Sequence, residues 1–338
     1  MGRGNTLVMT IAGRQNRLAA AAAAALAVAL LAIPLFGDYV IWLTANMLIL
    51  ALFAVGFNLL FSFTGLLSFG QAAFFAVGGY VCALILLAVP SLLLGVVGGV
   101  VAAGVAALII GFLCVRHTEI YFAMLTLAFG MMIHSIIWKW RSVTGGDDGL
   151  VGVPRAPLEI PGLLSVDMAG LERYYYFVLV LVALGIFVIW RVVRSSLGLT
   201  LQSIRDSESR ATFIGLSVTK YRLIAFTIAG LASGLAGALM VPLGRSASPA
   251  IANWTFSAEP VIATLLGGAF TFAGPIVGSF LFYIIKEIVV IFTGYWMMTL
   301  GIIVLALVLG FRGGVVSVVE YHLLPLLARR RNDQGGDR

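Results

Sequence analysis

Long uninterrupted apolar runs recur along almost the whole chain and are separated by short polar segments. The runs at 18–36 and 40–61 are typical, because each continues for about 20 residues without alternation between apolar and polar positions. Barrel strands would instead show segments of roughly ten residues in which apolar and polar positions alternate. The pattern therefore predicts an all-α polytopic membrane protein.

The apolar runs predict about ten transmembrane helices, some of them short or broken. The expected crossings are 18–36, 40–61, 69–89, 91–114, 120–138, 174–193, 222–243, 258–272, 274–292 and 295–311. The eighth run is short, and glycines and a proline interrupt its junction with the ninth. Two alternatives stay open for 258–272, a full crossing or a re-entrant segment, and the crossing is preferred.

The positive charges give the chain a direction across the membrane. If the N-terminus is cytoplasmic, fifteen Lys and Arg residues fall inside, five fall outside, and Lys286 lies within a span. Cytoplasmic loops carry an excess of Lys and Arg, so both termini are predicted to be cytoplasmic. This topology divides the chain into a cytoplasmic segment 1–17, a transmembrane domain 18–314 with an external loop 139–173 and a cytoplasmic loop 194–221, and a cytoplasmic tail 315–338.

Composition excludes several function classes. The chain is 61% hydrophobic and only 10% charged, whereas soluble domains carry about 25% charged residues. Its net charge of +7 comes from residues that lie mainly between the apolar runs and indicate topology. No nucleic-acid binding is therefore predicted. The sequence contains no P-loop, no His-Glu-x-x-His and no Cys/His cluster. We therefore predict no enzyme activity, no metal site and no cofactor in this chain.

Polar groups and glycines interrupt two of the hydrophobic hairpins. The motif GLLSFG at 65–70 resembles GAFTFA at 268–273, and each stands at the junction of two spans. Transporters often carry repeats with broken helices near the substrate path, although packing and turn chemistry would explain the same pattern. The candidate path residues are Gly65, Ser68, Phe69, Gly70, Gln71, Gly267, Gly268, Thr271, Phe272 and Gly274.

The cytoplasmic loop 194–221 contains an amphipathic pattern. Apolar residues recur at helical spacing, while charged residues lie mainly off that stripe. We expect one short helix, 197–215, ended by Gly215, which lies on the membrane or inserts into a protein partner; both charge signs favour the partner. The candidate coupling residues are Leu201, Ile204, Arg205, Asp206, Ala211, Ile214 and Gly215.

Four blocks of sequence resemble the LivM-type permease subunits of branched-chain amino-acid ABC importers. They are 58–80, 120–150, 195–215 and 265–278, in the order found in that family. The resemblance implies a homologous second permease, two cytoplasmic ATPase subunits that hold ATP and Mg²⁺, an external or periplasmic binding protein, and a location in the inner membrane. It also implies that 197–215 is the coupling helix.

Some positions depart from that family's usual pattern. Thr212 stands in place of an acidic residue, Gln71 in place of histidine, and Met131 and His134 in place of Gln and Tyr. The substrate therefore stays open between branched-chain amino acids and the urea, short amides or aromatic acids carried by related permeases. An ion-coupled secondary transporter is the alternative from another class, and a membrane-embedded enzyme is a more distant one.

Overall fold

The computed structural model describes residues 29–117, 119–160, 164–292, 294–310 and 314. Its helices are η1 (Ile33–Phe36), α2 (Asp38–Asn58), η2 (Leu59–Thr64), α3 (Gln71–Ala88), α4 (Leu92–Cys114), α5 (Glu119–Lys139), α6 (Arg141–Thr144), η3 (Gly146–Asp148), α7 (Leu171–Val193), α8 (Ser196–Asp206), α9 (Glu208–Phe213), α10 (Val218–Gly244), η4 (Pro249–Ala252), α11 (Trp254–Gly267), α12 (Gly274–Phe292) and α13 (Trp296–Gly310). Four short strands are β1 (Leu150–Val151), β2 (Leu158–Ile160), β3 (Leu164–Val166) and β4 (Ser246–Ala247).

The helices confirm the predicted all-α membrane fold. Within the described residues, seven helices are long and apolar enough to cross a bilayer. They correspond to seven of the ten predicted crossings, and α11 and α13, of 14 and 15 residues, correspond to two more. Most of the predicted crossing 18–36 lies outside the described residues. The segments 1–17 and 315–338 lie wholly outside them.

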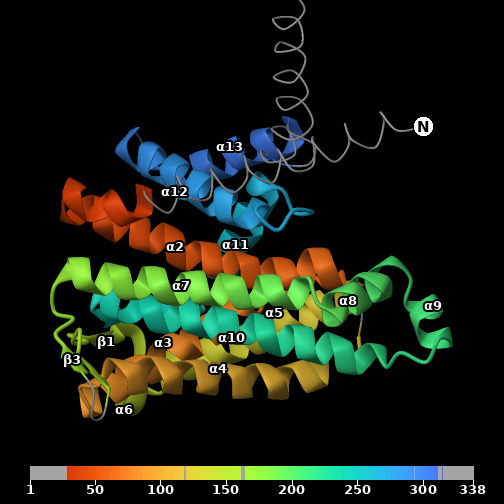
Figure 1. Ribbon diagram of the computed structural model, residues 1–338, viewed down its shortest axis with the longest axis horizontal. Helices are drawn as coiled ribbons and strands as arrows, with labels where there is room; N and C mark the ends of the chain where they lie inside the picture. Colours follow the sequence, from red (N-terminus) through yellow and green to blue (C-terminus); the bar gives the residue numbers. More distant parts are fainter. Residues whose placement is uncertain (1–28, 118, 161–163, 293, 311–313, 315–338) are drawn as a thin grey trace, which may run out of the picture.

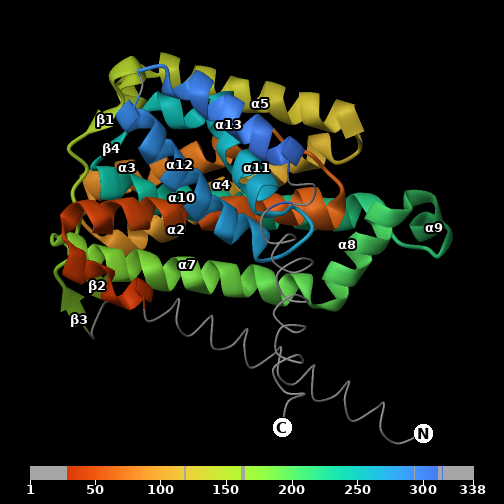
Figure 2. The same ribbon diagram turned by 90° about the horizontal axis from the view of Figure 1, so that it is seen from above.

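The two predicted loops lie at opposite ends of the helix bundle. The short strands and α6 gather at one end, and α8 and α9 project from the other (Figures 1 and 2). At the α8 end, Arg205 donates a hydrogen bond to the Ser62 carbonyl at the end of η2. At the opposite end, the Tyr39 hydroxyl donates to Glu287 Oε2 over 2.7 Å. Asn58, at the end of α2, bonds to Thr271 just before α12 begins, so α2 and α12 run in opposite directions.

Helix α11 runs alongside α2 in the same direction. The Thr264 hydroxyl lies 3.5 Å from the Ala54 carbonyl, and further along both helices Ser62 contacts the carbonyl of Ala269. At 1.5 Å per residue, 14 residues span about 21 Å, which is less than the ~30 Å hydrocarbon core. Helix α11 is therefore a short element that ends in the turn 268–273, from which α12 returns.

The core of the bundle is formed where α10 packs against α3 and α4. Glycines let the helix backbones approach closely: a Cβ built on Gly237 would lie 1.9 Å from the Phe75 carbonyl oxygen, and one on Gly78 would lie 2.3 Å from that of Gly234. Membrane helices without a hydrophobic driving force between them associate largely through such close van der Waals packing. The small residues therefore set the positions of these three helices.

The described residues of the loop 139–173 contribute to two short antiparallel ribbons. Strand β1 pairs with β4, and β2 pairs with β3, in antiparallel ribbons. Arg155 donates from Nε to the Pro242 carbonyl over 3.1 Å and from Nη2 to the Leu243 carbonyl over 3.0 Å. Burial, followed by the nearby charge of Arg245, lowers the pKa of Arg155. The guanidinium thus satisfies the last carbonyls of α10, which have no partner within the helix.

Replacing Arg155 by methionine is expected to loosen the contact of this loop with α10. Hydrogen bonds that involve a charged group contribute about 1.5–3 kcal/mol each, and α10 would lose two of them. The thermal midpoint of the purified protein in detergent should therefore fall by several degrees. Arg173→Met is the matched control, because both contacts of Arg173 with Asp167, an ion pair at 3.9 Å and a hydrogen bond to its carbonyl at 3.2 Å, are exposed and such contacts contribute little. Equal midpoints for the two variants would contradict this role of Arg155.

Candidate substrate path and coupling segment

The two glycine-containing turns, 65–70 and 268–273, lie at the same end of the bundle and are connected through the end of α2. Asn58 Nδ2 donates to the Thr271 carbonyl over 3.3 Å. The Ser62 hydroxyl lies within hydrogen-bonding distance of the Asn58 side-chain carbonyl, at 2.6 Å, and of the Ala269 main-chain carbonyl. Both Asn58 and Ser62 are buried. The two motifs that look alike in the sequence therefore belong to one connected region.

Helix α2 ends in a π-helix, η2, immediately before the first turn. Gly65 follows it in the left-handed conformation, with φ of +76°, and its N–H bonds to the Leu60 carbonyl. Residues other than glycine adopt this conformation only at a cost. Short π-helical segments are frequent at functional sites because they interrupt the regular helical ladder. Gly65 thus allows the chain to leave the helix and run as an extended segment to α3.

The polar candidates of the first turn are buried and bonded within the chain. Ser68 is fully buried, and its hydroxyl accepts from the Gly70 N–H over 3.4 Å. Gln71, at the start of α3, accepts a hydrogen bond of 2.8 Å from the Ser233 hydroxyl on α10, while its Nε2 has no partner among the described atoms. The side chain of Gln71 is therefore buried at the contact between α3 and α10.

The candidates of the second turn shape the hairpin between α11 and α12. The Thr271 hydroxyl accepts from the Gly274 N–H over 3.0 Å and so caps the start of α12. A Cβ on Gly267 would lie 1.7 Å from the Gly274 carbonyl oxygen, and one on Gly274 would lie 2.0 Å from that of Gly268. These glycines are therefore required for the close approach of the two helices. Phe272 is partly buried.

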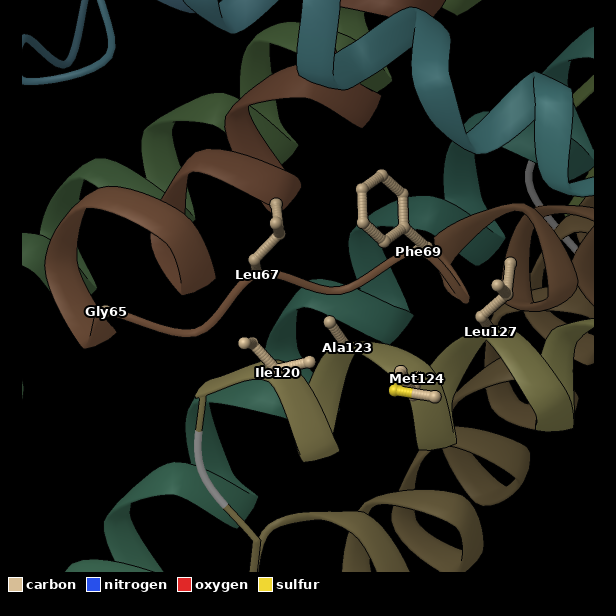
Figure 3. Close-up of a pocket in the computed structure, with 7 residues that line it drawn as sticks. All are labelled: Gly65, Leu67, Phe69, Ile120, Ala123, Met124 and Leu127. Atoms are coloured by element: carbon tan, nitrogen blue, oxygen red, sulfur yellow. The ribbon is translucent and has the colours of Figure 1, made fainter.

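A cavity of about 460 Å³ lies between the first turn and α5. Figure 3 shows side chains of the turn and of α5 lining it. The lining residues are Gly65, Leu67, Phe69, Ile120, Ala123, Met124 and Leu127. All of them are apolar, so the cavity suits an aliphatic or aromatic group. Gly65 and Phe69 are among the predicted path candidates, whereas Leu67 and the α5 residues are not, because an apolar helix gives no signal of which face borders a cavity.

The segment 194–221 contains two helices, α8 and α9, and the prediction of a single helix over 197–215 is wrong. Ser207 interrupts it with an extended backbone (φ −165°, ψ 103°), and its hydroxyl accepts from the Arg210 N–H as the N-cap of α9. Serine is favoured at this position because its oxygen satisfies a free N–H of the first turn. The capping chemistry of Ser207 therefore overrides the continuous apolar spacing.

Helix α9 ends at Phe213, and Gly215, the residue predicted to end the helix, follows two positions later with φ of +87°. The Leu216 N–H bonds to the Ala211 carbonyl over 3.1 Å and the Gly215 N–H to that of Thr212 over 2.9 Å. This pair of bonds is a Schellman motif, in which a left-handed glycine satisfies the last carbonyls of a helix. Leu216 packs on the small buried cluster of Ile204, Ala211 and Val218.

Most of the apolar stripe of this segment is buried against the rest of the chain. Leu201, Ile204 and Ala211 are each at most 2% exposed, whereas Phe213 is 90% and Ile214 is 76% exposed. A bidentate ion pair, with distances of 2.9 and 3.1 Å, joins Glu208 to the buried guanidinium of Arg222 and holds α9 against α10. Of the candidate coupling residues, Ile214 is the apolar one left free to contact another molecule. Phe213 was missed because it lies beside the predicted stripe.

A family model described as branched-chain amino acid transport system / permease component matches residues 39–311. The chain belongs to this family. The match covers all seven long helices except for Asp38 at the start of α2. It therefore also covers both turns and the helices α8 and α9.

Three curated relatives are similar to this permease-family chain. The high-affinity branched-chain amino acid transport system permease protein LivM of Salmonella typhimurium strain LT2 is 28% identical over 280 residues, and that of Escherichia coli strain K12 is 27% identical over 285; each match covers 75% of this chain and 64% of the relative. The probable branched-chain amino acid transport permease protein LivH of Methanocaldococcus jannaschii is 24% identical over 253 residues, covering 71% of this chain and 77% of the relative. The chain thus matches less than two thirds of the length of the LivM relatives. No solved structure matches it.

Proposed function

We propose that this chain is the transmembrane permease subunit of an ABC importer that moves branched-chain or related amino acids inward. The observation that carries the proposal is the family match across 39–311, which includes a membrane region with broken helices and a separate helix pair at one end. The LivM and LivH relatives are both named as permeases of branched-chain amino-acid transport. This favours a homologous second permease as the partner within the membrane.

The proposed orientation places α8, α9 and both termini in the cytoplasm and the strand ribbons on the external side of the inner membrane. The excess of Lys and Arg in the segments assigned to the cytoplasm supports it. Of the two ATPase subunits, one would then bind α9, and an external or periplasmic binding protein would deliver substrate near the strand ribbons. ATP and Mg²⁺ would be held by the ATPase subunits.

The substrate path would run beside the turns 65–70 and 268–273, where the helices are interrupted. The apolar cavity beside α5 offers space for an aliphatic side chain, and main-chain groups at the turns offer polar contacts. ATP binding would close the ATPase dimer, move the cytoplasmic helices and shift the permease pair between outward and inward access. Because ATP supplies the shift, the permease itself needs only weak contacts with its substrate.

Reconstitution tests the proposal. The tagged chain would be co-expressed with the ATPase, second permease and binding protein encoded with it, purified in mild detergent, and placed in liposomes. We expect the subunits to co-purify and radiolabelled leucine, isoleucine or valine uptake to require ATP and the binding protein. Competition with urea, short amides and aromatic acids would define the substrate class. Uptake by the chain alone, without ATP and driven by an ion gradient, would overturn the proposal in favour of a secondary transporter.

A further inference from the structure

Helix α8 packs against the helices of the bundle. It contacts η2, α7 and α10, and Leu201 and Ile204 are buried in these contacts. Protein interiors are close-packed and transmit displacement, so a movement of α8 would displace the elements it touches. The element among these that leads directly to the turn 65–70 is η2.

Arg205 makes the specific contact between α8 and η2. Its Nη1 donates to the Ser62 carbonyl, and carbonyls in the last turn of a helix lack intrahelical partners. Its aliphatic stem lies against Gly65, because a Cβ on Gly65 would be 2.9 Å from Arg205 Cγ. The outer side of the same guanidinium pairs with Asp206, from Nε at 3.1 Å and Nη2 at 2.9 Å. One nitrogen of Arg205 therefore bonds to η2, and the other two bond to Asp206 on the outer side.

The contact continues from Ser62 to the second turn. The Ser62 hydroxyl contacts the Ala269 carbonyl, and Asn58, one turn earlier in α2, bonds to the Thr271 carbonyl. One arginine of the cytoplasmic segment is thus linked, through the buried end of α2, to both interrupted hairpins. Energetic coupling between distant sites can be carried by a contiguous set of polar contacts of this kind.

We propose that Arg205 is a positioning residue that transmits movement of α8 to the turns 65–70 and 268–273, and that it does not act by contacting the ATPase. This inference rests on the proposed function. It differs from a docking role, in which the outward pair with Asp206 would matter and loss of Arg205 would release the ATPase subunits.

The test compares Arg205→Met, Arg205→Lys and Asp206→Asn in the reconstituted importer. Methionine keeps an apolar stem against Gly65 and removes the guanidinium, whereas lysine keeps a charge and a donor. For each variant, three quantities are measured: ATPase co-purification, ATP hydrolysis, and substrate molecules imported per ATP hydrolysed. For Arg205→Met we expect co-purification and hydrolysis within about twofold of wild type and at least a tenfold drop in import per ATP, because a bond to a charged donor is lost. Arg205→Lys should restore part of this ratio, and Asp206→Asn should lower it by less than Arg205→Met does.

A second variant covers the case in which Arg205→Met does not fold. Gly65→Ala places a methyl group against the arginine stem and strains the turn, so it should lower import per ATP in the same way while the ATPase still binds. Loss of co-purification in Arg205→Met, an equal drop in Asp206→Asn, or an unchanged ratio in both Arg205→Met and Gly65→Ala would overturn the inference. If wild type shows no ATP-dependent import, the proposed function fails instead, so the two failures are distinguishable.

Discussion

Replacing Phe213 by aspartate is expected to release the ATPase subunits from the permease. Phe213 is 90% exposed at the end of α9, a helix that projects beyond the long helices of the bundle (Figure 2). Exposed aromatic residues that enter a pocket on a partner often contribute 2–4 kcal/mol to binding. A charge at that point would have to be desolvated without a partner. We expect recovery of the ATPase in pull-downs to fall by at least tenfold, with ATP-driven import falling in parallel.

Two controls isolate the apolar contact of Phe213. Phe213→Leu keeps the apolar character and should retain most of the binding. Ser209→Asp adds the same charge to an exposed position of α9, near the helix N-terminus where acidic side chains are tolerated, and should reduce recovery by no more than about twofold. Normal recovery with Phe213→Asp would exclude Phe213 from the ATPase contact. An equal loss with Ser209→Asp would show that charge alone is responsible.

Replacing Gly237 by alanine is expected to lower the stability of the helix bundle. The added Cβ would lie 1.9 Å from the Phe75 carbonyl oxygen and 2.7 Å from its carbonyl carbon, which are backbone atoms that cannot move without shifting α3. Overpacking of this kind typically costs 1–3 kcal/mol, occasionally more, and outweighs the ~1 kcal/mol that alanine contributes to a helix relative to glycine. The thermal midpoint in detergent, followed by the height of the monodisperse size-exclusion peak, should fall by several degrees.

Gly244→Ala is the control from the same helix. The nearest atom to a Cβ at Gly244 is the Ser246 hydroxyl oxygen at 4.0 Å, so the substitution creates no clash and alters helix propensity in the same direction. Its midpoint should equal or exceed that of wild type. A Gly237→Ala protein as stable as Gly244→Ala would mean that α3 and α10 can separate at little cost.

Hydropathy was sufficient to predict most of the helices because burial in lipid demands long apolar runs with every backbone group bonded internally. It gave the eighth element as 258–272, whereas α11 begins at Trp254 and ends at Gly267. Asn253, whose side chain accepts from the Thr255 N–H over 3.1 Å, caps α11 before its apolar run starts. Because a cap is a single polar residue, it does not change the mean hydropathy of the surrounding stretch and was not predicted.

The candidate site was only partly predictable. The glycine-containing turns were found because polar residues and glycines stand out within apolar runs. Their mutual contact through Asn58 and Ser62 was not found, since the residues involved are separated by 207 to 213 positions. The α5 wall of the cavity was also missed, because in a membrane protein apolar side chains face both lipid and core.

The sequence by itself determined that the chain is an all-helical membrane protein with a polar amphipathic segment at one end, because hydropathy and charge are local properties. The tertiary structure decided which face of that segment stays free. An apolar stripe can be buried equally well against its own chain or against a partner, so the sequence does not decide between them. In the structure, α8 and α9 pack on η2, α7 and α10. This packing leaves Phe213 and Ile214 exposed and directs Arg205 to the Ser62 carbonyl.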